Sequence, residues 1–251
     1  MNQFETNAKI IFGYPALILI FTWSIFILEI STDFEFYKLG ILPREFSGLI
    51  GIITSPFIHS AEDVKHILSN SVPIFILTAS LIHFYKEIAP KVLTIIWLGG
   101  GFLTWIYARE SYHIGMSGVV YGLTGFLFTS GAIRKYKPLM GLSLFVVFLY
   151  GSLIWGILPL ETKVSWEGHL SGLIVGVLAA IIYRKEGPQQ PKFRYEIEKE
   201  MGIEPIDYEN IWRSSFPKEN ESLDEENQNQ IKREDQSFTY TYHIRKSEDE
   251  S

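Results

Sequence analysis

The apolar residues of the chain form long uncharged runs separated by short polar segments. Six runs contain no Lys, Arg, Asp or Glu, and they occupy residues 10–28, 67–85, 92–108, 114–133, 139–160 and 168–183. Each run holds 16 to 22 residues, and about 20 helical residues cross the ~30 Å hydrocarbon core of a bilayer. The pattern predicts an all-α membrane protein with six transmembrane helices.

The composition changes after Arg184. Residues 1–184 carry 12 Lys and Arg against 11 Asp and Glu, whereas residues 185–251 carry 10 against 17. The second stretch has too few apolar residues to bury a core, so we expect it to be largely disordered. Within it, residues 193–202 have the pattern of a short helix and residues 237–245 alternate like a strand, and the sequence leaves their order open. We predict two domains: a transmembrane domain over residues 1–184 and an acidic tail over residues 185–251.

The basic residues of the short loops indicate how the chain is oriented, because cytoplasmic loops carry an excess of Lys and Arg. With the N-terminus in the cytoplasm, the inner segments hold Lys9, Lys86, Lys91, Arg134, Lys135, Lys137, Arg184 and Lys185. The outer segments hold fewer basic residues and more acidic ones. We therefore expect both ends of the chain to be cytoplasmic.

Polar residues in the second, fourth and sixth runs fall at a similar depth. These three helices run in the same direction, from the outer surface inward. Ser117 is the fourth residue of the fourth run and His169 is the second residue of the sixth. His66 and Asn70 flank the start of the second run. Polar groups within membrane helices usually face the bundle interior or a wet cavity, so we expect these side chains to meet about one turn below the outer face.

Glycines predict that the fourth and sixth helices pack closely. Gly172 and Gly176 share a helix face with His169, and small residues at this spacing let another backbone approach. The fourth run has its own set of glycines at Gly115, Gly118, Gly122 and Gly125. The two helices should therefore touch where the serine and the histidine lie.

A serine and a histidine at this contact suggest nucleophilic catalysis. A serine hydroxyl becomes a good nucleophile when a neighbouring histidine takes its proton. No Asp or Glu lies within the runs to orient the ring, so a Ser–His dyad is expected instead of a triad. Taken alone, His169 could equally be a structural histidine that bonds a neighbouring helix. Tyr121, one turn after Ser117, could stack on the imidazole or be an ordinary buried aromatic.

Hydrogen-bond donors for a developing oxyanion are available beside Ser117. The first N–H groups of a helix that begins there have no partner within the helix. His66 and Asn70 are spaced i, i+4 and therefore share one face of the second helix. Acyl transfer requires such donors, although this pair could also cap its own helix.

Four motifs lie in order along these helices. They are TSPFIHS (54–60) leading into HILSN (66–70), WLGGGFLTW (97–105), GMSGVVYGLTG (115–125) and GHLSGLIVG (168–176). In combination they resemble the motifs of the rhomboid family of intramembrane serine proteases, over roughly residues 40–184.

The resemblance implies a six-helix rhomboid bundle with Ser117 as nucleophile and His169 as general base. It also assigns the oxyanion site to the Ser117 backbone N–H with His66 and Asn70, and the stacking role to Tyr121. Rhomboid-like enzymes cleave transmembrane segments of other proteins near the outer membrane face. The implied partners are transmembrane substrates and lipids in a bacterial inner membrane, and the tail either binds a cytoplasmic partner or only solubilises the C-terminus. No cofactor and no metal are expected.

The first outer segment departs from the family pattern. Residues 29–57 contain no tryptophan, so the Trp–Arg pair of some members is missing. We expect Arg44 and nearby aromatics to anchor this segment instead; the aromatics are Phe34, Phe36, Tyr37 and Phe46. Substrate entry is expected between the second and fifth helices, where the bulky residues are Phe145, Phe148, Leu149 and Trp155. The loop over residues 159–167 is expected to act as a lid.

Several other classes of function require residues or patterns that this sequence lacks. The absence of cysteine removes disulfides and thiolate chemistry, and no HExxH motif of a zinc protease is present. An aspartyl protease would need two membrane-embedded aspartates, and nucleic-acid binding would need a basic stripe. A transporter would place its polar residues near the middle of the membrane. The alternative that we keep is an inactive rhomboid-like protein that binds or escorts membrane clients.

Overall fold

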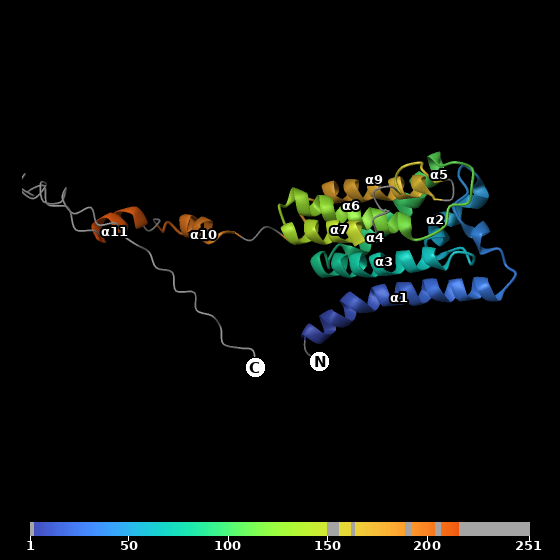
Figure 1. The fold of residues 1–251 in the computed structure, drawn as a ribbon, viewed down its shortest axis with the longest axis horizontal. Helices are drawn as coiled ribbons and strands as arrows, with labels where there is room; N and C mark the ends of the chain where they lie inside the picture. The colour runs from blue at the N-terminus through green and yellow to red at the C-terminus, as the bar shows by residue number, and fades with distance from the viewer. Residues whose placement is uncertain (1–2, 150–155, 162–163, 189–191, 204–206, 216–251) are drawn as a thin grey trace, which may run out of the picture. The chain divides into compact units, whose positions relative to one another are not determined.

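The computed structural model describes residues 3–149, 156–161, 164–188, 192–203 and 207–215. Within these residues the chain is helical apart from turns and an isolated bridge between Ile41 and His113. The long helical elements are α1 (Gln3–Ser31), α3 (Val64–Phe84), a continuous stretch of α4 (Ala89–Thr94), η4 (Ile95–Gly99) and α5 (Gly100–Tyr107), then α6 (Ser117–Ile133), α7 (Lys137–Leu149) and α9 (Trp166–Ile182) (Figure 1). Short turns before α3 are η1 (Phe36–Leu39), η2 (Phe46–Leu49), α2 (Gly51–Thr54) and η3 (Ser55–Phe57). The all-α class predicted from the sequence is confirmed.

Among the residues that the structure describes, three stretches are long and apolar enough to cross a membrane, as in an integral membrane protein. They are Ala8–Ser31, Val64–Phe84 and Ala89–Tyr107. The apolar helices α6 and α9 have 17 residues each, which corresponds to about 26 Å. The fifth predicted run begins within α7, while residues 150–155, including the expected gate residue Trp155, lie outside the described residues.

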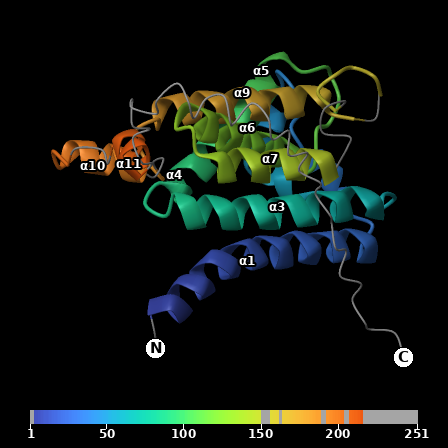
Figure 2. The ribbon, with the colours of Figure 1, turned by 60° about the vertical axis from the view of Figure 1, so that its left-hand side comes forward.

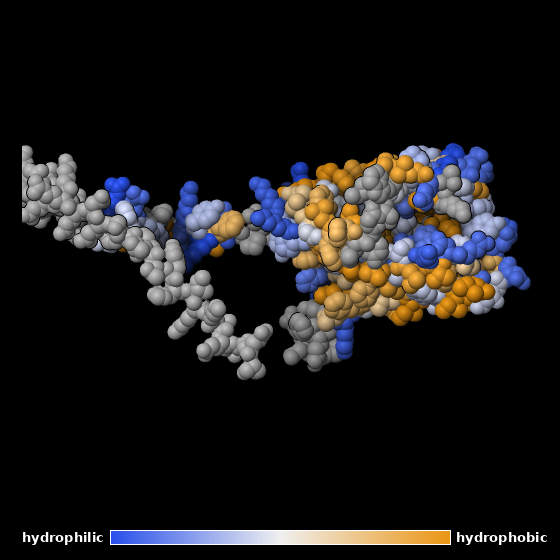
Figure 3. All heavy atoms as spheres, viewed as in Figure 1, coloured by the Kyte–Doolittle hydropathy of each residue, from blue (hydrophilic) through white to orange (hydrophobic). Residues whose placement is uncertain are grey.

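The helices pack side by side with α6 in the middle of the bundle. α6 contacts α9, α7 and α3, and α1 packs against α3 at one edge (Figures 1 and 2). α1 curves toward its N-terminal end (Figure 2) and contains Pro15, a residue that removes a helical hydrogen bond and bends a helix. Large apolar side chains of α1 such as Leu17 and Ile20 are more than half exposed, and hydropathic colouring shows an apolar band along the bundle (Figure 3). This surface suits contact with lipid.

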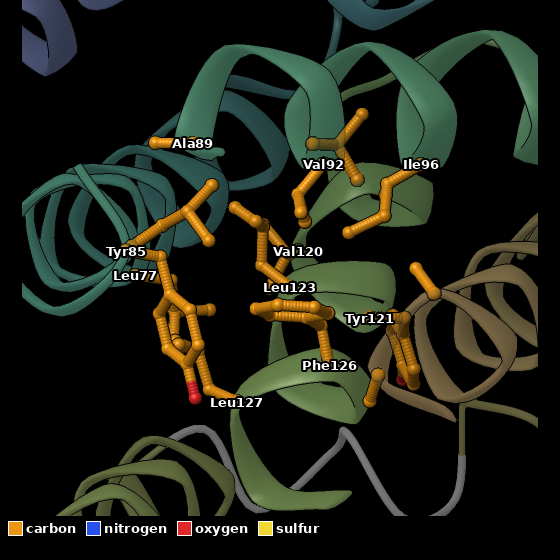
Figure 4. Close-up of a cluster of buried hydrophobic side chains, with 14 of the residues drawn as sticks. Leu77, Tyr85, Ala89, Val92, Ile96, Val120, Tyr121, Leu123, Phe126 and Leu127 are labelled. Carbon is orange, nitrogen blue, oxygen red and sulfur yellow. The ribbon is translucent and has the colours of Figure 1, made fainter. Parts of the chain in front are cut away.

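The buried core surrounds α6. Leu123, Phe126 and Leu127 of α6 are completely buried and face Leu77 of α3 and Tyr85 (Figure 4). The Tyr85 and Phe126 rings meet edge to face with centroids 5.0 Å apart. Lipid tails are as apolar as these side chains, so close packing, not exclusion from water, is what stabilises such a contact.

A buried arginine joins the C-terminal ends of three helices, α3, α6 and α9. Arg134, which follows α6, is 6% exposed and donates to the backbone oxygens of Tyr183, at 2.6 Å, and of Glu186. It also bonds the Ser130 hydroxyl, to which the Tyr85 hydroxyl donates at 2.8 Å. These bonds link the C-terminal end of α6 to the residues that follow α9 and to Tyr85, which follows α3.

The segment between α1 and α3 is anchored by Arg44, as we expected. Its backbone N–H donates to the Trp105 carbonyl at 3.0 Å and its guanidinium donates to the Ala108 carbonyl at 2.6 Å. Trp105 in turn donates from its indole N–H to the Glu45 carbonyl at 2.9 Å, so α5 provides a tryptophan beside this arginine. Phe46 is 88% exposed, so its side chain does not hold the segment by packing within the described part of the protein.

The other aromatic residues of this segment make ring contacts. Phe34 and Phe36 meet edge to face at 4.8 Å, and Tyr37 meets Tyr112 in the same way at 5.5 Å. The contact with Tyr112 links the segment to the loop before α6.

The chain divides into two compact units, Met1–Pro191 and Lys192–Ser251. The second unit contains α10 (Arg194–Glu200) and α11 (Tyr208–Ser215), and α10 confirms the short helix suggested by its sequence. The strand-like residues 237–245 lie outside the described residues.

Candidate active site

Ser117 is the first residue of α6, although the apolar run begins three residues earlier. The helix starts late because Gly115 has a φ of +105°, which is outside the helical range and favours glycine. The Gly115 N–H donates to the Ser55 carbonyl at 2.9 Å, so the turn is tied to the segment before α3. Ser117 therefore sits where the backbone N–H groups of α6 lack helical partners.

Ser117 and His169 are in direct contact. The Ser117 Oγ lies 2.7 Å from the His169 Nε2, and the His169 Nδ1 lies 2.7 Å from the Gly156 carbonyl oxygen. A carbonyl oxygen can only accept, so Nδ1 carries the ring proton and Nε2 is left to accept from the serine hydroxyl. The Gly156 carbonyl thus holds the imidazole where a triad would use a carboxylate.

The Tyr121 ring stacks on the imidazole. The centroids of the Tyr121 and His169 rings are 4.2 Å apart and their planes differ by 12°. Tyr121 points from α6 toward α9, on the opposite side of α6 from Tyr85 (Figure 4). The stacked ring restricts the rotation of His169, which is only 9% exposed.

Glycines bring the backbones of α6 and α9 together below this pair. A Cβ added at Gly172 would lie 1.9 Å from the Gly118 carbonyl oxygen, and one at Gly176 would lie 2.0 Å from the Gly122 carbonyl oxygen. Real Cβ atoms do not approach oxygen this closely, so any other residue would separate the helices. Gly115 lies against α3 instead of α9, because a Cβ added at this position would lie 2.7 Å from the His66 ring.

His66 and Asn70 both reach the turn before Ser117. The position of a Cβ at Gly115 is 2.8 Å from the His66 Nε2 and 3.9 Å from the Asn70 Nδ2. Asn70 is buried, with 6% of its surface exposed. The structure thus brings His66, Asn70, Ser117 and His169 together at the N-terminal ends of α3, α6 and α9.

His59 belongs to the same cluster, although the sequence analysis assigned it no role. It is completely buried, and its Nε2 lies 3.1 Å from the Asn70 Nδ2 and 3.4 Å from the Met116 backbone nitrogen. A backbone N–H can only donate, so Nε2 is an acceptor and orients the Asn70 amide group through one of its two hydrogens. The second hydrogen remains for another acceptor. Burial, with a smaller effect of His66, lowers the pKa of His59 to about 3 and keeps it neutral.

A small cavity of about 40 Å³ opens beside Ser117. Its polar lining includes Ser55, Thr104 and His113, and Trp97 forms part of its wall. Trp97 belongs to η4, a π-helical turn within the third long helix, and such turns often occur at functional sites.

The fold and the site define an integral membrane protein in which a buried serine and histidine meet between two closely packed helices. Residues 47–186 match the Rhomboid domain family. Uncharacterized proteins of Mycobacterium tuberculosis and Mycobacterium bovis are each 32% identical over 183 residues, covering 66% of this chain and 73% of the relative. An uncharacterized protein of Mycobacterium leprae is 30% identical over 197 residues, covering 71% and 75%. The chain belongs to the rhomboid family.

Proposed function

We propose that this rhomboid-family protein is an intramembrane serine endopeptidase that cleaves transmembrane segments of other membrane proteins. The observation that supports this most strongly is the 2.7 Å distance between the Ser117 Oγ and the His169 Nε2. An inactive protein that only binds clients would require neither the serine nor the ring orientation set by the Gly156 carbonyl.

In the proposed reaction, the Ser117 Oγ attacks the carbonyl carbon of the scissile bond while the His169 Nε2 takes the hydroxyl proton. The tetrahedral intermediate collapses, the C–N bond breaks, and His169 gives the proton to the leaving amine. An ester joins Ser117 to the remaining fragment. A water molecule then attacks this ester with His169 again acting as base, which releases the carboxylic acid and restores the serine.

The oxyanion of the intermediate would be stabilised by donors near the start of α6. The Ser117 N–H lies at the positive end of the helix dipole, and the free hydrogen of the Asn70 amide and the His66 ring lie beside Gly115. Preorganised donors of this kind are typically worth about 2.7–4 kcal/mol each in the transition state. The stacked Tyr121 ring would keep the His169 imidazole oriented toward the Ser117 hydroxyl during both proton transfers.

For the topology, we propose six membrane crossings, with both ends of the chain in the cytoplasm of a bacterium. The distribution of Lys and Arg supports this orientation, and the relatives are mycobacterial proteins. We divide the chain into the transmembrane protease domain, residues 1–184, and the acidic tail, residues 185–251. Transmembrane substrates and lipids are its proposed partners, and the tail is the proposed site for a cytoplasmic partner.

The test is cleavage of a model single-span substrate by the full-length protein in liposomes. The wild-type protein should release two fragments, and Ser117→Ala and His169→Ala should each release none. Ser80→Ala is the control, because the Ser80 hydroxyl donates to the Ile76 carbonyl within its own helix, α3. Wild-type cleavage by Ser117→Ala would refute the proposal. Substrate binding without cleavage by the wild-type protein would favour the client-binding alternative.

A further inference from the structure

A second hydrogen bond between a histidine and a serine lies just outside the first. The His113 Nδ1 is 2.6 Å from the Ser165 Oγ. His113 is four residues before Ser117, and Ser165 is four residues before His169. The outer pair therefore joins the same two chain segments as the inner pair, with the histidine and the serine exchanged between them.

The roles of the atoms in this outer pair follow from their partners. The His113 Nε2 lies 3.1 Å from the Arg109 carbonyl oxygen, which can only accept, so Nε2 carries the proton and Nδ1 accepts from the Ser165 hydroxyl. Burial lowers the pKa of His113, which keeps the ring neutral for this role.

The Ser165 hydroxyl does not cap α9. Ser165 is the N-cap residue of α9, yet its side chain makes no capping bond. A capping serine accepts from a backbone N–H of the first turn and typically stabilises a helix by about 1 kcal/mol. Here the hydroxyl is instead directed to His113, across to the segment that leads into α6.

The backbone of Ser165 connects directly to His169. The Ser165 carbonyl accepts from the His169 N–H at 3.1 Å, so the position of Ser165 sets the position of the imidazole. The backbone of His113 is itself fixed, because it exchanges two hydrogen bonds with Ile41 at 2.9 and 3.0 Å. Three hydrogen bonds close a ring through the residues between His113 and Ser117: Ser165 donates to His113, His169 donates to the Ser165 carbonyl, and Ser117 donates to His169.

We propose that His113 and Ser165 are a positioning pair that sets the distance between Ser117 and His169. Neither residue takes part in bond making. The pair fixes the register of the loop before α6 against the first turn of α9, and this inference rests on the proposed function of the inner pair. Arg109 supports the same contact, because its guanidinium donates to the Val164 carbonyl at 2.6 Å and lies 3.7 Å from the Glu167 carboxylate.

The proposal predicts that Ser165→Ala lowers kcat for a membrane substrate by about 10-fold to 100-fold and leaves KM unchanged, because a displacement of about 1 Å between reacting groups costs about 100-fold. Ser165→Thr keeps the hydroxyl and should restore most of the activity. His113→Asn combined with Ser165→Ala should be no worse than Ser165→Ala alone, since both changes remove one interaction. Ser80→Ala should leave kcat and KM at the wild-type values.

A second measurement separates positioning from loss of folded protein. A fluorophosphonate probe reacts with an activated serine when Oγ displaces fluoride from phosphorus, and the final labelled fraction reports how much protein is active. Ser165→Ala should label Ser117 to the same final fraction as the wild type but with a rate constant reduced in parallel with kcat. A lower final fraction with an unchanged rate constant would overturn the proposal in favour of a purely structural role.

Two further outcomes would also overturn it. A Ser165→Ala variant with wild-type kcat and labelling rate would show that the outer pair does not matter to the inner one. Label attached to Ser165 would make that serine a nucleophile instead of a positioning residue. Absence of label on Ser117 in the wild-type protein is a different result, because it would refute the proposed function itself and the positioning role with it.

Discussion

The contact between α6 and α9 and the contact between α1 and α3 both join two long apolar helices, but they are built differently. Between α6 and α9, glycines such as Gly172 and Gly176 leave no room for a Cβ, so backbone lies against backbone. Between α1 and α3, the contact uses aromatic rings, such as Phe12 stacked on Phe75 at 6.3 Å, and a hydrogen bond from the Trp23 indole to the Ser71 hydroxyl at 3.1 Å.

The difference reflects what each contact has to hold. Two backbones in contact have no side chain between them that could rearrange, and the proposed reaction needs the Ser117 Oγ and the His169 Nε2 at hydrogen-bond range. Large side chains on an exposed helix can repack with little cost, and much of α1 is exposed where lipid would lie. We infer that the protein is rigid where the chemistry occurs and tolerant at its edge.

The largest effect is expected on α3, where Asn70 faces the turn before Ser117 and its neighbour Ser71 faces α1. Asn70 lies toward His59 and the turn before Ser117, so Asn70→Ala should lower kcat by about 10-fold to 1000-fold through loss of an oxyanion donor. KM for a membrane substrate should change little. Steady-state cleavage in liposomes measures both quantities, and an unchanged kcat would remove Asn70 from the oxyanion site.

A matched pair of glycine substitutions tests the packing difference. Gly176→Ala forces a Cβ against the Gly122 carbonyl and should lower the free energy of unfolding by about 1–3 kcal/mol. Gly13→Ala in α1 meets nothing within 4 Å and should be neutral or raise stability by up to about 1 kcal/mol, because alanine favours helix over glycine. Thermal unfolding in one detergent compares the two, and equal destabilisation would contradict the account.

Acid should lower the free energy of unfolding through His59, which is buried beside the start of α6. The folded state lowers the pKa of His59 to about 3, whereas an unfolded histidine titrates near 6.5. Between these values the unfolded state binds more protons, so the free energy of unfolding should fall as the pH falls, by at most about 1.4 kcal/mol per pH unit. Denaturation midpoints between pH 7 and pH 4 measure the slope.

The control for this pH dependence is His59→Asn, which removes the titrating group. The variant should be less stable at pH 7 and should show a flatter slope between pH 7 and pH 4. A slope as steep as that of the wild type would mean that another group is responsible.

The smallest effect is expected at the α1 and α3 contact. Ser71→Ala removes the acceptor of the Trp23 indole N–H and should lower the free energy of unfolding by about 0.5–1.5 kcal/mol. Cleavage by the folded protein should keep its wild-type kcat, since Ser71 points away from the partners of Asn70. A fall in kcat as large as that of Asn70→Ala would erase the distinction between the two faces of α3.

The all-α class and the convergence of the polar residues could be predicted from the sequence, because both depend on simple regularities. Uncharged runs mark apolar helices, and the shared direction of the second, fourth and sixth runs brings Ser117 and His169 to one depth. The glycine spacing indicated the close approach of Gly118 and Gly122 to α9.

Features that depend on backbone atoms or on loops could not be predicted in this way. The Gly156 carbonyl that orients His169 is a backbone group, so no pattern of side chains in the sequence could indicate it. His59 lies in a loop, where helical periodicity assigns no direction, although it stands within the quoted TSPFIHS motif. Ser165 stands just before α9, where a serine commonly caps the helix, and only the structure shows that its hydroxyl is bonded to His113.

The central claim is that His169 activates the hydroxyl of Ser117. The most direct measurement is mass spectrometric mapping of the residue labelled by a fluorophosphonate probe in the full-length wild-type protein and in His169→Ala. The account predicts label on Ser117 in the wild type and a labelling rate reduced by at least about 100-fold in the variant, within the usual 10²–10⁴-fold contribution of a general base. Equal labelling rates in the two proteins, or label on a different serine in the wild type, would contradict it.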